Sequence, residues 1–188
     1  MEEWTLFLRV FLGTIFLSTG ISKVRNMQEH ILIVKEYRIL PSSQIYIVAR
    51  VEVLIELFTG MMLFLGLFQT IGAVLASLLL ILYSLAITIN LIRGRNGISC
   101  GCGGAVGSHQ ISWFLVLRNL TLMTLAGWVY FNPAKWGSIE NLWQGDSSDF
   151  FHLLVIQNIL MAWLALLFFM MINGIWRIHT KVRPFLRD

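Results

Sequence analysis

Charged side chains are scarce in this chain of 188 residues: only 13% are Asp, Glu, Lys or Arg, whereas 57% are hydrophobic. The mean hydropathy is +0.74. These values lie far outside the soluble range and exclude a soluble domain. The apolar runs also lack the alternation of a membrane barrel, and an open sheet would leave backbone groups unpaired in lipid. Helices within a bilayer are therefore the expected structure.

Proline is equally scarce, and its three copies, Pro41, Pro133 and Pro184, fall between or beyond the apolar runs. Uninterrupted runs of about 20 residues match a hydrocarbon core of about 30 Å. The sequence predicts an all-α polytopic membrane helix bundle of about five transmembrane helices in one domain, residues 1–188. Four form a core over residues 5–130, and an additional helix covers residues 150–176. The expected spans are Trp4 to Ser22, Ile45 to Leu67, Thr70 to Ile92, Ser112 to Tyr130, and Phe150 to Ile175.

The ends of the first run carry two further signals. Met1-Glu2-Glu3 is acidic where a secretory signal would be basic, so this run is predicted to be a retained helix. The connector from Lys23 to Ser43 carries apolar residues between charged positions, in a pattern that predicts a short amphipathic helix at the membrane interface. Its apolar positions are Met27, Ile31, Ile33, Val34 and Ile39.

Basic residues are distributed unevenly over the connectors. One side of the expected bundle has only Lys135, although Glu2, Glu3, Glu140, Asp146 and Asp149 lie there. Short loops rich in Lys and Arg remain in the cytoplasm. The distribution predicts a multi-pass protein of the cell membrane with its N terminus outside and its C terminus in the cytoplasm. The other side holds Lys23, Arg25, Lys35, Arg38, Arg93, Arg95, Arg177, Lys181, Arg183 and Arg187.

The chain has only two cysteines, Cys100 and Cys102, separated by one glycine in a glycine-rich connector. Residues two apart in a turn or extended conformation can bring their Cα atoms within disulfide range. The resulting small ring is strained, and strained disulfides are labile and oxidising. We therefore expect a redox-active pair with a role in electron transfer and no structural role.

Other interpretations of the pair remain open. The predicted orientation puts it at the cytoplasmic face, where thiols are kept reduced, so either it receives electrons from cytoplasmic thiols or its connector folds back into the bundle. Two thiolates can also hold a soft ion such as Cu(I), with His109 as a conceivable third ligand. Two incidental thiols are the remaining possibility. Of these, we favour thiol redox chemistry and expect no metal site.

Charged residues within the apolar runs are a second candidate feature, because each costs about 2.5–3.5 kcal/mol at the centre of a span. Glu52 and Glu56 lie four residues apart on one helix face and call for nearby cations, which Arg9 and Arg118 can supply. Lys23 is expected at the same depth as the cysteine connector, where cations lower the pKa of a thiol. Arg9, Lys23, Glu56 and Arg118 are therefore predicted to support the pair; the alternative is that they only fix helix register.

Several motifs occur in an order that resembles the MauE and DoxX superfamily of redox-associated membrane proteins, with MauE the closer branch. The similarity covers about residues 5–125. Its fairly specific element is Cys-Gly-Cys-x-Gly, although Ser99 and Gly103 stand where the family usually has an acidic and an aromatic residue. The matching elements are Arg9, residues 18–23, residues 37–41, residues 56–60, residues 90–94, residues 100–104, and Arg118-Asn119.

This resemblance implies thiol-disulfide traffic that supports disulfide formation or maturation of exported proteins, with a thioredoxin-like partner. A bilayer quinone is the other electron partner considered, and it would need an aromatic-lined slot between helices. The lipid bilayer is also an expected partner, whereas nucleic acid is not. Two other functions stay open: a soft-metal transport or assembly protein, and a non-catalytic maturation or immunity factor. Whether the protein is an enzyme is left undecided.

Overall fold

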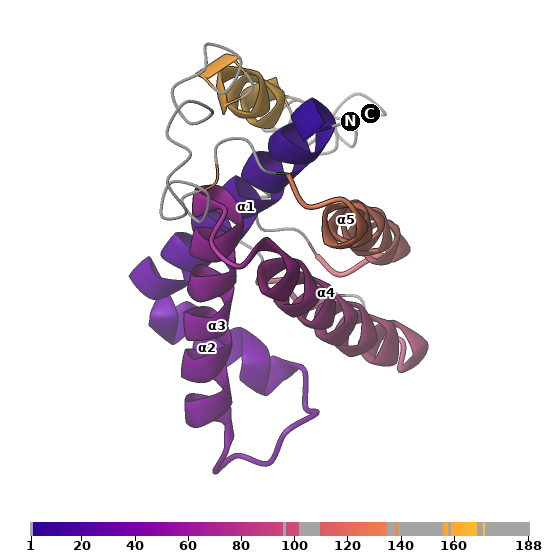
Figure 1. The fold of residues 1–188 in the computed structure, drawn as a ribbon. Helices are drawn as coiled ribbons and strands as arrows, with labels where there is room; N and C mark the ends of the chain where they lie inside the picture. Colours follow the sequence, from indigo (N-terminus) through magenta and orange to yellow (C-terminus); the bar gives the residue numbers. More distant parts are fainter. Residues whose placement is uncertain are drawn as a thin grey trace.

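The computed structural model describes residues 2–95, 97–101, 110–134, 138, 156–157, 159–168 and 171. All regular elements of this part of the chain are helices (Figure 1). A further helical stretch covers Ile159–Phe168. The all-α prediction is confirmed. The five labelled helices are α1 (Glu2–Arg25), α2 (Met27–Glu36), α3 (Ile45–Leu65), α4 (Gln69–Ile92) and α5 (Trp113–Phe131).

The long helices pack as two pairs, α1 with α3 and α4 with α5. Glycines allow the first pair to approach closely: a Cβ added at Gly13 would lie 2.7 Å from the backbone nitrogen of Phe64, and one at Gly60 would lie 2.8 Å from that of Leu17. Small residues at helix crossings are a common way to pack helices in membranes. The two pairs meet in an apolar core built from Leu12, Phe16, Leu63, Ala73, Ala76, Leu79, Leu80, Ala126 and Val129.

Gly13→Ala should lower the stability of the protein, because the added methyl group forces the two helix backbones apart. We expect a loss of about 1–3 kcal/mol, typical of overpacking. The matched control is Gly127→Ala in α5, where a Cβ meets nothing within 4 Å. That change should be neutral or slightly stabilising, since alanine favours helix. Thermal unfolding in detergent measures both; equal melting temperatures for the two variants would contradict the close α1–α3 contact.

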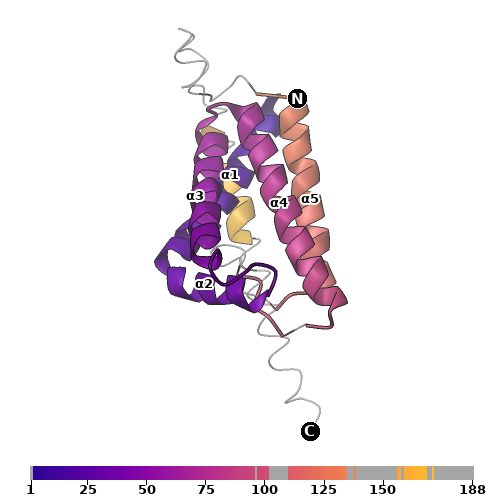
Figure 2. The same ribbon diagram turned by 90° about the horizontal axis from the view of Figure 1, so that it is seen from below.

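Helix α2 lies across the end of the bundle at which α1 and α4 finish (Figure 2). The described residues 97–101 of the cysteine connector lie at this same end, beside Tyr37. Residues 98–99 and 110–111 of this connector are joined by an antiparallel bridge between Ser99 and Gln110 and by a hydrogen bond of 2.9 Å from Ile111 N to Ile98 O. Both isoleucines are buried in a cluster with Tyr37 of the α2 C-terminus. These contacts therefore fix the position of Cys100 relative to α2.

Four of the five expected spans coincide with helices, but the count of five transmembrane helices is not confirmed. By length and composition, α1, α4 and α5 could cross a membrane. Helix α3 is 21 residues long and carries Arg50, Glu52 and Glu56, which sets it apart from these apolar helices. The described part of the fifth expected span is the helical stretch Ile159–Phe168. Its residues Ala162 and Leu166 pack against α1. The other residues of that span lie largely outside the described part.

Candidate functional site

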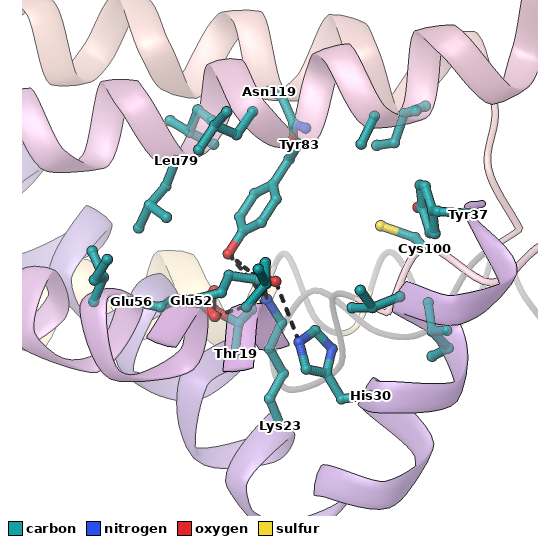
Figure 3. A pocket seen from close by; sticks show the side chains of 18 of the residues that line it. Thr19, Lys23, His30, Tyr37, Glu52, Glu56, Leu79, Tyr83, Cys100 and Asn119 are labelled. Carbon is teal, nitrogen blue, oxygen red and sulfur yellow. Dashed lines mark hydrogen bonds and ion pairs between the residues drawn. The ribbon is translucent and has the colours of Figure 1, made fainter. Parts of the chain in front are cut away.

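A cavity of 560 Å³ lies between the α1–α3 pair, helix α2 and the α4–α5 pair. Most of its lining is apolar. Polar side chains from all five labelled helices lie on its walls, and Cys100 lies at one end (Figure 3). The sulfur of Cys100 points toward the middle of the cavity. The polar lining residues are Thr19, Lys23, His30, Tyr37, Glu52, Glu56, Tyr83, Arg118 and Asn119.

Lys23 is the centre of the polar cluster. Its Nζ atom lies 2.8 Å from Glu52 Oε1 and 2.8 Å from Glu56 Oε2, and it donates a hydrogen bond of 3.1 Å to the Tyr83 hydroxyl. Tyr83 in turn donates to Glu52 Oε1 at 3.0 Å. Lys23 is only 5% exposed. One ammonium group thus faces two carboxylates in a site of low dielectric, where an unpaired charge would be costly.

The position of Lys23 corrects part of the sequence interpretation. The lysine was counted among the basic residues of a connector, but α1 continues to Arg25 and turns Lys23 inward. The cation that the structure pairs with Glu52 and Glu56 is Lys23, whereas Arg9 and Arg118 were expected in that role. The spacing of the two glutamates was interpreted correctly, since both face the same lysine.

Glu56 is held from a second direction by α1. The Thr19 hydroxyl donates to its Oε1 atom at 2.7 Å, and both side chains are buried. Because Thr19 and Lys23 lie one helical turn apart on α1, they approach α3 on the same face. This pair of contacts fixes both carboxylate oxygens of Glu56.

His30 is a site residue that the sequence analysis missed. Its Nε2 atom lies 3.4 Å from Glu52 Oε2. On its other side, a Cβ added at Gly101 would lie 3.8 Å from Nδ1, so the imidazole lies between the cysteine connector and the charge cluster. The available signal was its spacing: His30 lies three and seven residues before Ile33 and Tyr37, on the buried face of α2.

Cys100 packs in the apolar cluster that contains Tyr37, Ile98 and Ile111. Burial raises the pKa of Tyr37 to about 12, so its hydroxyl stays protonated near neutral pH and remains a hydrogen-bond donor. Cys100 is disulfide-bonded. Cys102 lies outside the described residues, so the predicted pair stays a prediction. Gly101 has a φ of 70°, a conformation that glycine adopts without strain, and packs its backbone against Ile33.

The two arginines predicted to support the site lie in different places. Arg118 lines the cavity, and its Nη2 atom donates to Asn119 Oδ1 at 3.2 Å. Arg9 is buried elsewhere: a Cβ added at Gly66 would collide with its guanidinium, which places it beside the turn after α3. The structure therefore brings Lys23, Glu56, Arg118 and Cys100 together around one cavity and leaves Arg9 at the opposite end of the bundle.

Comparison with known proteins identifies the family. A family model described as methylamine utilisation protein MauE matches residues 1–132. The chain belongs to the MauE family. It is 37% identical over 126 residues to the MauE protein of Paracoccus denitrificans, covering 67% of each chain. It is 34% identical over 145 residues to that of Paracoccus versutus, covering 76% of this chain and 77% of the relative. No solved structure matches.

The MauE match confirms the resemblance drawn from the motifs and spans every residue of the cavity. It ends before the helical stretch Ile159–Phe168. Within the described part of the chain, no group of three or more His, Cys, Asp or Glu side chains could hold a metal ion. His109, the ligand considered for copper, lies outside that part. The chemical roles of the cavity residues remain predictions.

Proposed function

We propose that this MauE-family protein is a membrane thiol-disulfide redox protein that serves methylamine utilisation. Cys100 and Cys102 form the exchanging pair. A thioredoxin-like protein is the partner, and the exchange supports disulfide formation in, or maturation of, exported proteins. The observation that carries the proposal is the position of Cys100 on the wall of a cavity that also holds the buried cluster around Lys23. The link to methylamine rests on the names of the relatives.

The reaction at the pair is a two-electron exchange. A thiolate of the partner attacks the Cys100–Cys102 disulfide and forms a mixed disulfide between the two proteins. The second thiol of the partner then attacks the partner sulfur of this mixed disulfide, which closes the partner's own disulfide and releases this protein as a dithiol. The partner is oxidised to its disulfide and the protein pair is reduced, with two protons passing from the partner dithiol to the pair. His30, beside Gly101, is placed to take up or supply protons during these steps.

The proposal includes a multi-pass arrangement with the N terminus outside and the C terminus in the cytoplasm. It is supported by the distribution of Lys and Arg. In this arrangement the ends of α1 and α4, and with them the cysteine connector, face the cytoplasm.

Thiol trapping in intact cells tests both the chemistry and the orientation. Cells are treated with a membrane-impermeant maleimide, before and after lysis and with and without a reductant, and modification is followed as a gel shift. We expect modification only after lysis, with two maleimides added in the reduced sample and none in the oxidised one. Complete modification without reductant would contradict a resting disulfide. Modification of reduced intact cells from outside would reverse the orientation but keep the redox pair.

A growth test asks whether methylamine utilisation depends on Cys100 and Cys102. A host that lacks its own MauE protein is supplied with this chain or with the Cys100→Ser, Cys102→Ser double variant, and growth on methylamine as nitrogen or carbon source is measured. The unchanged chain should restore growth and the double variant should not. Equal growth of both strains would favour a protein that acts by partner binding alone.

A further inference from the structure

The cavity beside Cys100 is open toward the lipid. Several large apolar residues of its wall are also exposed on the outside of the bundle, among them Ile47 at 65%, Val51 at 46% and Leu82 at 60%. These side chains belong to α3 and α4, whose outer faces meet the hydrocarbon in a membrane. A molecule that reaches the cavity between these helices therefore comes from the bilayer and must itself dissolve in lipid.

Polar groups face the same cavity from opposite walls. His30 is 6% exposed and Asn119 is 2% exposed. Among the described residues, neither His30 Nδ1 nor Asn119 Nδ2 has a hydrogen-bond partner, although both atoms are buried. Figure 3 shows Asn119 with Tyr83 on one side of the cavity and His30 with Lys23 on the other. Asn119 Nδ2 can donate to a ligand oxygen, whereas His30 Nδ1 donates when the imidazole is protonated and accepts from a hydroxyl when it is neutral with Nε2–H toward Glu52. Their placement suits a flat ring with an oxygen on each side that is a carbonyl in one redox state and a hydroxyl in the other.

A second requirement comes from Cys100. The ligand shares its cavity with a redox-active sulfur, so a lipid-soluble carrier of two electrons fits the site better than an inert acyl chain. An acyl chain would leave the buried polar atoms without partners. The cavity volume of 560 Å³ lies within the usual range of about 300–1,000 Å³ for small-molecule sites.

We infer that this cavity binds a membrane quinone, which accepts the electron pair from the reduced Cys100–Cys102 dithiol. The inference rests on the proposed function and adds its oxidant and the direction of electron flow. In the reaction two S–H bonds break and one S–S bond forms. The quinone takes up two electrons and two protons, and each carbonyl oxygen becomes a hydroxyl. The products are the disulfide and the quinol, which leaves through the lipid-facing opening.

The polar cluster offers a route for the protons. His30 lies beside Gly101 on one side and 3.4 Å from Glu52 on the other, and Glu52 accepts hydrogen bonds from Lys23 and Tyr83. The cluster contains two carboxyl groups, Glu52 and Glu56, and one ammonium group, Lys23. A proton released by a thiol can thus be held on this cluster before it reaches a quinone oxygen.

Binding is tested with decyl-ubiquinone and the purified full-length protein in lipid nanodiscs, by calorimetric titration. Ala86→Phe fills the cavity from α4 without changing charge and should weaken quinone binding by about tenfold or more, since the added ring takes the space of the ligand. Leu85→Phe is the control: this residue is 54% exposed and does not line the cavity. It should bind decyl-ubiquinone like the unchanged protein.

Electron transfer is tested by mixing the dithiol form with decyl-ubiquinone without oxygen and following the ultraviolet absorbance of the quinone. One quinol should form for each disulfide. His30→Gln keeps a polar side chain but removes the proton carrier; at saturating decyl-ubiquinone it should form quinol about 10²-fold more slowly. Ala86→Phe should lose quinol formation together with binding.

The possible failures are distinguishable. If decanol binds as tightly as decyl-ubiquinone, or if Ala86→Phe binds the quinone unchanged, the cavity is not a quinone site and the inference is wrong. If thiol trapping finds a cycling pair but no quinol forms, the quinone is wrong and the proposed function stands. If quinone binds but the cysteines never change their redox state, the electron-transfer step fails together with the proposed function.

Discussion

Lys23→Met should destabilise the protein more than any other single substitution in the cavity. Lys23 is the ammonium group that the structure places 2.8 Å from both Glu52 and Glu56, whose side chains are 19% and 3% exposed. Removing one partner of a buried ion pair costs about 3–5 kcal/mol, because the remaining charge stays in a medium that solvates it poorly. For a chain of this length, this corresponds to a fall in melting temperature of roughly 6–20 °C in detergent.

Two further variants separate charge from packing. Lys23→Met combined with Glu52→Gln and Glu56→Gln removes the uncompensated carboxylates and should recover most of the lost stability. Lys35→Met is the matched surface control, since Lys35 is exposed at the end of α2, and it should leave the melting temperature unchanged. If the triple variant is no more stable than Lys23→Met alone, the loss comes from packing and the ion pairs contribute little.

The long helices were predictable because their signal is local. Each apolar run is bounded by charges, glycine or proline, and the observed helices α1, α3, α4 and α5 begin and end within three residues of the expected bounds. The spacing of Glu52 and Glu56 likewise implied one shared face. Such inferences need only helix periodicity and the cost of charge in lipid.

The pairing of charged side chains between different helices was harder to predict from the sequence. A sequence gives the register of a residue on its own helix but not the rotation of one helix against another, so the choice among Lys23, Arg9 and Arg118 could not be made. The sequence interpretation placed Lys23 in a connector, at the depth of the cysteines, and assigned the glutamates to Arg9 and Arg118. In the structure α1 continues beyond the expected end at Ser22 to Arg25, and Lys23 is enclosed by α3 and α4.

His30 and the cavity depend on a contact that no local pattern encodes. Helix α2 is short and looked like a surface element with one apolar face, yet that face packs beneath the cysteine connector and carries His30 inward. The cavity exists because α3 and α4 diverge toward this end of the bundle (Figure 1). Two glycine-dependent approaches, Gly13 against α3 and Gly101 against α2, set these positions.

Replacing either cysteine by serine should abolish oxidation of a thioredoxin-like partner, because a two-electron exchange needs both sulfurs. The two single variants should then differ. Each single variant is mixed with a thioredoxin-like partner that keeps only its attacking cysteine, activated as a mixed disulfide with thionitrobenzoate. The remaining cysteine thiolate of this chain attacks the partner sulfur and releases thionitrobenzoate, and the adduct persists because neither protein has a second thiol to resolve it. The variant that keeps the cysteine accessible to the partner should therefore hold it as a covalent adduct. The variant that keeps the other cysteine should hold little or none. Non-reducing electrophoresis of membranes, followed by mass spectrometry of the shifted band, measures both.

The position of Cys100 suggests which variant traps the partner. Its sulfur points into the cavity and packs with Tyr37, Ile98 and Ile111, so a protein partner reaches it less easily than a ligand from the lipid. We therefore expect the adduct when Cys102 is kept, in Cys100→Ser, and not in Cys102→Ser. The double variant controls for unrelated disulfides and should give no adduct. Partner oxidation by either single variant at the unchanged rate would show that the pair is dispensable, and would leave the buried cluster around Lys23 as a structural feature of the bundle.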